Sequence, residues 1–141
     1  MVLGGTGMNR KTKEFIFRGV VVSGLGEGQY FTQLDWVRQQ FLAKFGFEPI
    51  AGTFNIKVDP ESETLLATLR NFPGIAILPP SSEFCAAKCF PARVGSSIDG
   101  VLVIPLVEFY PRGLMEIVAP VRVRQTLGVD DNDSVEVRVS P

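Results

Sequence analysis

Short apolar segments, separated by glycine, proline and acidic turns, run through most of the chain. Residues 14–22 are rich in β-branched and aromatic side chains, which favours a strand. Residues 52–58 alternate well enough between polar and apolar positions for a second strand. By the same criteria, five more strands are predicted at 75–78, 84–94, 101–105, 114–119 and 135–140.

The clearest helical pattern follows residue 32. Thr32 and Asp35 fit a capping box at its start, and Gly46 is placed to end it in the left-handed conformation. Its apolar positions recur at helical spacing, at Leu34, Val37, Phe41, Leu42 and Phe45. Residues 61–70 predict a shorter helix whose buried side carries Leu65, Leu66 and Leu69. One or two helical turns are predicted at 120–127, ahead of an acidic turn at 130–133.

This order of elements favours a mainly β fold. Many short strands, one good helix and turn signals about every ten residues are typical of a small barrel. Helices do not alternate regularly with strands, which argues against a doubly wound parallel sheet. A length of 141 residues suits one domain. We expect that domain at 14–141, after a flexible lead-in at 1–13 that lacks the apolar core of a secretory signal.

Composition narrows the function classes. Fourteen basic and fifteen acidic side chains give a net charge of −1, whereas nucleic-acid binders usually carry a basic surplus, so we expect no nucleic-acid partner. No apolar run approaches the roughly 18 residues of a membrane span, so we expect no membrane partner either. The chain has no histidine, which excludes Ser-His-Asp and Cys-His catalysis and histidine-ligated zinc.

The two cysteines predict no chemistry of their own. Cys85 and Cys89 are spaced CxxxC, without a second pair to complete a zinc site, and the spacing is not that of a redox CxxC. We interpret them as small apolar residues in a reduced, cytoplasmic protein.

A glycine-rich segment at 23–30 is the first candidate for binding. Gly24, Gly26 and Gly28 allow the backbone to approach a bound group closely. The segment follows a predicted strand and precedes a helix, so its N–H groups are placed to face an anion. It lacks the lysine and Ser/Thr of a Walker A loop and is not GxGxxG. A plain glycine-rich hairpin is the alternative.

Two further segments carry polar side chains in informative places. Thr53 and Asn55 lie two apart on a predicted strand, so they share a face and could supply oxygen ligands to magnesium. A polar strand face or an Asx turn is the alternative. Glu116 stands among apolar residues and needs a partner, which would be an arginine or a polar ligand. Arg122 and Arg124 form a small basic cluster suited to the phosphates of a nucleotide.

Three of these segments together resemble the archaeal CTP-dependent riboflavin kinases. The chain has SGLGEGQYF at 23–31, GFEPIAGTFN at 46–55 and MEIVAPVRVRQTLGVDDNDSVEV at 115–137. The family has SGLGEGxYF, GFxPYxGTLN and EIIAPxxLRxxLxLxDGDxV in the same order. The intermediate segments 98–100 and 103–105 also fit, so the similarity covers about 19–139.

The resemblance implies a six-stranded cradle-loop barrel that binds nucleotide and flavin side by side. The activity would be transfer of the γ-phosphate of CTP to riboflavin, giving FMN and CDP, by a cytoplasmic monomer that uses magnesium. Thr53 and Asn55 would hold the metal and Glu116 would contact the flavin. The nucleotide would lie against two segments, Gly24, Leu25, Gly26, Glu27, Gly28, Gln29 and Val121, Arg122, Val123, Arg124. The sequence names no general base.

One position departs from the family in a way that bears on the acceptor. Glu108 stands where the VPxxTxY segment of the family has a threonine that contacts the flavin. A carboxylate there would weaken FMN binding or favour a different small acceptor. A non-catalytic flavin- or nucleotide-binding module on the same barrel is therefore an alternative. A DNA-binding regulator is disfavoured by the balanced charge and by the lack of a helix-turn-helix. Ile50 and Phe54 also replace family residues, but they change packing more than chemistry.

Overall fold

The structure is a computed structural model that describes residues 14–24 and 27–141. The predicted lead-in at 1–13 lies outside the described residues, as do Leu25 and Gly26 of the glycine-rich segment.

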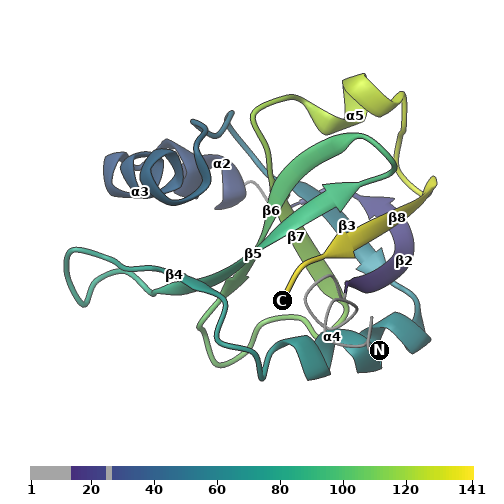
Figure 1. The fold of residues 1–141 in the computed structure, drawn as a ribbon, viewed down its shortest axis with the longest axis horizontal. Coiled ribbons are helices and arrows are strands. Elements are labelled where there is room, and N and C mark those ends of the chain that lie inside the picture. Colours follow the sequence, from purple (N-terminus) through teal and green to yellow (C-terminus); the bar gives the residue numbers. More distant parts are fainter. Residues whose placement is uncertain (1–13, 25–26) are drawn as a thin grey trace, which may run out of the picture.

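Six antiparallel strands form a closed barrel, as predicted (Figure 1). Their order is β5-β6-β7-β3-β2-β8, and pairing of β5 with β8 closes the ring. The strands are β2 (Phe15–Val22), β3 (Phe54–Val58), β5 (Ala87–Val94), β6 (Ile98–Pro105), β7 (Leu114–Val118) and β8 (Ser134–Val139). A seventh strand, β4 (Ile75–Ile77), extends the sheet beside β5.

The alternation of side chains along the strands fills the barrel. In β2, Phe15, Phe17 and Val21 are buried, whereas Ile16 is exposed, because successive side chains point to opposite faces. The inward side chains form one cluster whose largest fully buried members include Phe17, Ile56, Phe90, Leu102, Met115 and Ile117.

In the described residues, four helices lie around the barrel (Figure 1). They are α2 (Glu27–Gln33), α3 (Asp35–Phe45), α4 (Pro60–Leu69) and α5 (Val123–Leu127). Helix α4 lies at the opposite end of the barrel from α5, and the predicted leucines Leu66 and Leu69 join the barrel core. No helix in residues 14–24 or 27–141 is long and apolar enough to span a membrane.

Helix α3 packs on the outside of the sheet. Val37 and Phe41 are fully buried there in a second apolar cluster, together with Cys89 of β5. Gly46 ends the helix at φ 81°, as predicted, and its N–H donates to two carbonyls of the last turn. Leu42 belongs to the same apolar periodicity but is 53% exposed, because only one stripe of α3 faces the sheet.

Two local predictions before α3 are wrong. The glycine-rich segment is shorter than expected, because α2 already begins at Glu27. The capping box is also absent: Leu34 is the N-cap, and no side chain caps the helix. The fully buried hydroxyl of Thr32 instead donates to the Gly28 carbonyl at 2.9 Å and accepts the N–H of Gly52 at 2.9 Å. Thr32 therefore ties α2 to the approach to β3.

Both cysteines are free thiols. Cys85 is exposed and Cys89 is buried on β5. Burial raises the pKa of the Cys89 thiol to about 12, because the thiolate would lose its hydration.

Candidate active site

The glycine-rich segment packs directly on the polar side chains that precede and begin β3. A Cβ on Gly24 would lie 2.1 Å from Nδ2 of Asn55, and one on Gly28 would lie 2.5 Å from Oγ1 of Thr53. Neither distance is compatible with a side chain. The two glycines are therefore needed for close approach, and they bring the first and second motifs into contact.

The predicted metal ligands and the lone carboxylate meet in one polar cluster. The Thr53 hydroxyl lies 2.8 Å from Oδ1 of Asn55 and 3.2 Å from Oε1 of Glu116, and its single proton serves one of them at a time. Asn55 is 6% exposed and lies opposite Glu116 across the β3–β7 pair. The sheet register thus brings together residues of motifs that are far apart in the sequence.

Among the described residues, the partners of Glu116 are hydroxyl groups and not an arginine, which corrects one of the two sequence interpretations. Its Oε2 accepts a hydrogen bond from the Tyr110 hydroxyl, and Thr53 donates toward Oε1. Both donors are hydroxyls, which hydrogen-bond to the carboxylate without bringing an opposite charge to it. Tyr110 was not predicted, although it belongs to the segment that resembles VPxxTxY.

A large hollow opens over this cluster, and we call it the polar hollow. Its volume is about 570 Å³. Parts of all three motifs line it, and its lining includes Gly24, Gly28, Gln29, Thr53, Asn55 and Glu116. A volume of this order is large enough for a small organic ligand. Leu25 and Gly26 lie outside the described residues, and Glu27 opens α2.

A second, mostly apolar hollow adjoins the polar one. Its volume is about 210 Å³, and we call it the apolar hollow. Phe31, Cys85, Ala87 and Val103 line it outside the shared region. The two hollows share Gly28, Thr53, Val107, Tyr110 and Glu116. Together they offer apolar and polar surface side by side.

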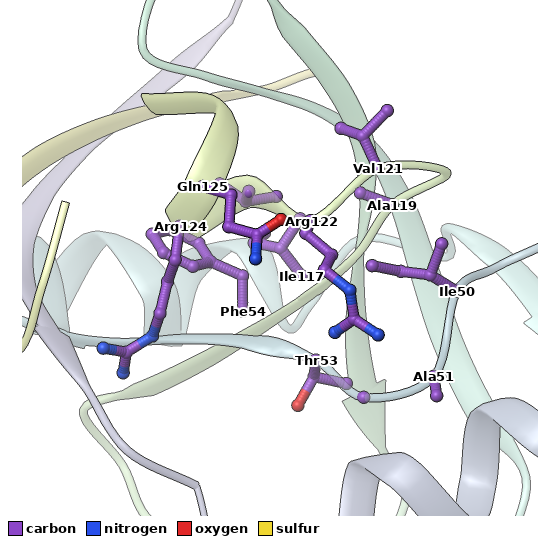
Figure 2. Close-up of a pocket in the computed structure, with 12 residues that line it drawn as sticks. Ile50, Ala51, Thr53, Phe54, Ile117, Ala119, Val121, Arg122, Arg124 and Gln125 are labelled. Atoms are coloured by element: carbon purple, nitrogen blue, oxygen red, sulfur yellow. The ribbon is translucent and has the colours of Figure 1, made fainter. Parts of the chain in front are cut away.

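The predicted arginine segment lines a third hollow of about 230 Å³, shown in Figure 2. We call it the arginine hollow; it lies between residues 50–54 and 121–125, and it shares Gly52 and Thr53 with the polar hollow. In Figure 2 the side chain of Arg122 reaches toward the side where Thr53 lies, whereas the Arg124 guanidinium points away. Arg122 is exposed, and within residues 14–24 and 27–141 its guanidinium has no ion pair.

Arg124 instead holds the surrounding loops together. Its Nη2 lies 2.6 Å from Oδ1 of Asp131 and 3.2 Å from the Val22 carbonyl. The Ser23 hydroxyl also donates to Asp131, at 2.8 Å. These two hydrogen bonds, that of Arg124 first, hold the pKa of the Asp131 carboxyl below its usual value. The acidic turn thereby links α5 to the start of the glycine-rich segment, a role that the sequence did not indicate.

Glu108 lies apart from the polar cluster. It is exposed and lines a hollow of about 200 Å³ together with Arg70 and Lys88. That hollow shares Val107 and Tyr110 with the polar hollow, but Glu108 lines neither the polar nor the apolar hollow. Contact between Glu108 and a flavin stays a prediction.

The donors of the polar cluster fit a hard divalent cation. A hydroxyl, an amide oxygen and a carboxylate are all oxygen ligands of the kind that magnesium prefers. The described part of the chain contains no group of three or more His, Cys, Asp or Glu side chains suited to a metal. A cation bound by Thr53 and Asn55 would therefore depend on further oxygens, such as phosphate and water.

Comparisons with known proteins agree with this architecture. The family model of CTP-dependent riboflavin kinases, described as "Domain of unknown function DUF120", matches residues 21–139. A riboflavin kinase of Archaeoglobus fulgidus is 39% identical over 86% of this chain and 53% of its own length. One from Methanocella arvoryzae is 38% identical over 86% of this chain and 56% of its own length. One from Ignicoccus hospitalis is 39% identical over 91% of this chain and 73% of its own length.

The chain thus spans little more than half the length of the first two relatives, and the match includes all three motif segments. The family model covers nearly the whole barrel, and the relatives are 38–39% identical, which is enough to assign the chain to a family. The chain belongs to the CTP-dependent riboflavin kinase family.

Proposed function

We propose that this protein transfers the γ-phosphate of CTP to riboflavin, giving FMN and CDP. The observation that carries the proposal is the convergence of three separated motifs on the polar hollow. Membership of the family supports the reaction class. We still predict that the protein is a cytoplasmic monomer without a nucleic-acid partner.

The nucleotide would occupy the arginine hollow and the adjoining side of the polar hollow. Gly24 and Gly28 hold the glycine-rich segment against Thr53 and Asn55, so phosphate oxygens beside those two side chains would also lie close to its backbone. Arg122 is the cation available for those phosphates, because Arg124 is engaged by Asp131.

Thr53 and Asn55 would hold magnesium, with Glu116 beside them. When bound, the ion would offset the negative charge of the phosphate oxygens. Glu116 also faces the apolar hollow, so its carboxylate is placed to accept hydrogen bonds from the acceptor. The Tyr110 hydroxyl fixes the orientation of that carboxylate.

Positioning is the main work of these residues. In the transfer, a ribityl oxygen forms a bond to the γ-phosphorus, the bond from that phosphorus to the β–γ bridging oxygen breaks, and the hydroxyl proton is released. Such transfers depend on alignment and charge neutralisation rather than on a covalent enzyme intermediate. The close packing of the glycine-rich segment on Thr53 and Asn55 supplies this alignment.

The test is a product assay with riboflavin, magnesium and one of CTP, ATP, GTP or UTP, followed by chromatography of the flavin. We expect FMN with CTP and much less with the other donors. Thr53→Ala should abolish most of the product while the protein stays folded. Thr68→Ala is the matched control, because Thr68 is exposed on α4 and its hydroxyl bonds only within that helix.

Each other result has a defined meaning. Riboflavin binding without FMN from any donor would indicate the non-catalytic binding module. CDP release that needs another acceptor would indicate a different kinase substrate. Full activity in Thr53→Ala would contradict the assignment of the polar cluster.

A further inference from the structure

Phe109 is an unusually exposed aromatic residue. Its side chain is 90% exposed, more than any other large apolar side chain in the described part of the chain. It lies between β6 and β7 in a segment that also exposes Leu106 and Val107. Apolar surface concentrated in so short a segment is typical of a ligand or partner contact.

The position of Phe109 indicates which kind of ligand it contacts. It lines the polar hollow beside Tyr110 and Glu116. Its neighbour Val107 lines both the polar and the apolar hollow. A ligand with a flat, largely apolar ring and a polar chain would place the ring under this segment and the chain toward Thr53 and Asn55.

We propose that Phe109 packs against the tricyclic ring of the flavin acceptor and determines the preference for an aromatic acceptor. This inference rests on the proposed function and adds to it a residue that contacts the ring. The ring is favoured over the cytosine base because the arginine hollow is lined by residues 50–54, 117, 119 and 121–125, and Phe109 is not among them. No other aromatic side chain that lines the polar hollow is as exposed as Phe109.

The expected effect is on binding and not on folding. Removing the ring of Phe109 deletes the ligand contact but few contacts within the protein, because the side chain is so exposed. Aromatic packing together with the apolar area that it buries corresponds to about a tenfold change in affinity. Phe109→Ala should therefore raise the KM for riboflavin about tenfold, with the KM for CTP and the melting temperature unchanged.

Two further variants and a second ligand make the test specific. Leu106→Ala is the matched control, because Leu106 is 54% exposed in the same segment but lines only the hollow of Arg70 and Lys88. Phe109→Tyr should keep the wild-type KM for riboflavin, because tyrosine retains an aromatic ring at this position. Lumiflavin, which has the flavin ring with a methyl group in place of the ribityl chain, should lose affinity for Phe109→Ala by the same factor as riboflavin.

Binding can be followed without turnover. Trp36 is the only tryptophan, and its ring packs on Phe31, which lines the apolar hollow, with centroids 6.3 Å apart. A flavin in the shared region should quench its fluorescence. Titrations of riboflavin and lumiflavin against wild type and variants therefore give affinities even if no FMN forms.

The outcomes separate the inference from the proposed function. Flavin binding weakened in Phe109→Ala, without FMN formation by the wild type, would support the ring contact and contradict the kinase activity. Equal flavin affinities in wild type and Phe109→Ala would overturn the inference, whatever the turnover. A raised KM for CTP would assign Phe109 to the nucleotide and would also overturn it. An absence of flavin binding by the wild type would overturn both.

Discussion

Replacing Gly28 by alanine tests the contact between the glycine-rich segment and β3. The added Cβ would lie 2.5 Å from Oγ1 and 2.8 Å from Cγ2 of Thr53, both far inside van der Waals contact. Overpacking of this kind costs about 1–3 kcal/mol. Gly28 lies in α2, where alanine is favoured over glycine by up to about 1 kcal/mol. The cost of the clash therefore exceeds the gain in helix propensity, and we expect a net destabilisation of about 1 kcal/mol.

The effect on turnover should be much larger than the effect on stability. To relieve the clash, either α2 or the Thr53 hydroxyl must move by several tenths of an ångström or more. Such a shift misplaces the groups that align the phosphates, and misplacement by about 1 Å can cost about 100-fold in rate. We expect FMN formation with CTP to fall by about that factor. Urea unfolding and the chromatographic product assay measure the two effects separately.

Gly46→Ala is the control for stability alone. Gly46 has nothing within 4 Å of an added Cβ, but its φ of 81° strains an alanine by about 1–2 kcal/mol. It lies at the end of α3 and lines none of the hollows described above. We expect comparable destabilisation with nearly unchanged turnover. If Gly28→Ala keeps wild-type turnover, or if both variants lose activity equally, the argument from close packing is refuted.

Four further predictions concern two arginines and the two thiols. Arg122→Ala should raise the KM for CTP about tenfold without lowering stability, because the charged hydrogen bonds that it loses are to the ligand. In Arg124→Ala the pKa of the Asp131 carboxyl should instead rise back toward its usual value, which an NMR titration would detect; an unchanged pKa would refute the ion pair as its cause. In the native protein only Cys85 should react with a thiol reagent, and Cys89 should react after unfolding; rapid reaction of two thiols would contradict the burial of Cys89. Because folding raises the pKa of Cys89 from 9.0 to about 12, its contribution to the free energy of unfolding is complete below pH 9 and is lost between these values, which denaturant titrations at pH 8 and pH 10 would measure.

Much of the barrel follows from local sequence pattern. The strands are predicted because their β-branched and aromatic residues alternate, and the end of α3 is predicted because Gly46 has no Cβ to oppose a left-handed backbone. The start of α3 is not predicted correctly, because the hydroxyl of Thr32 accepts a hydrogen bond from Gly52, a partner distant in the sequence, and does not cap the helix. The spacing of residues around Thr32 does not indicate whether its hydroxyl caps α3 or bonds to Gly52.

The site shows the same division. Thr53 and Asn55 share a face, as strand geometry predicts, and the motifs identify the segments that line the polar hollow. The Tyr110 bond to Glu116 and the link from Arg124 to Asp131 were not predicted. Both depend on how loops pack after the sheet has formed, and the spacing of residues along one segment does not encode this.

Closure of the barrel by β8 has a consequence for biosynthesis. Strand β2 pairs with β8 from Phe15↔Val139 to Val20↔Ser134, so the first of the described strands to be synthesised can pair fully only after the last one has been made. Asp131, which anchors both Ser23 and Arg124, emerges only just before β8. A nascent chain that still lacks this stretch would leave β2 and the Ala92–Val94 part of β5 without their β8 partner, and unpaired strand edges promote aggregation. The Asp131 contacts beside the candidate site therefore form only after the last part of the barrel has been synthesised.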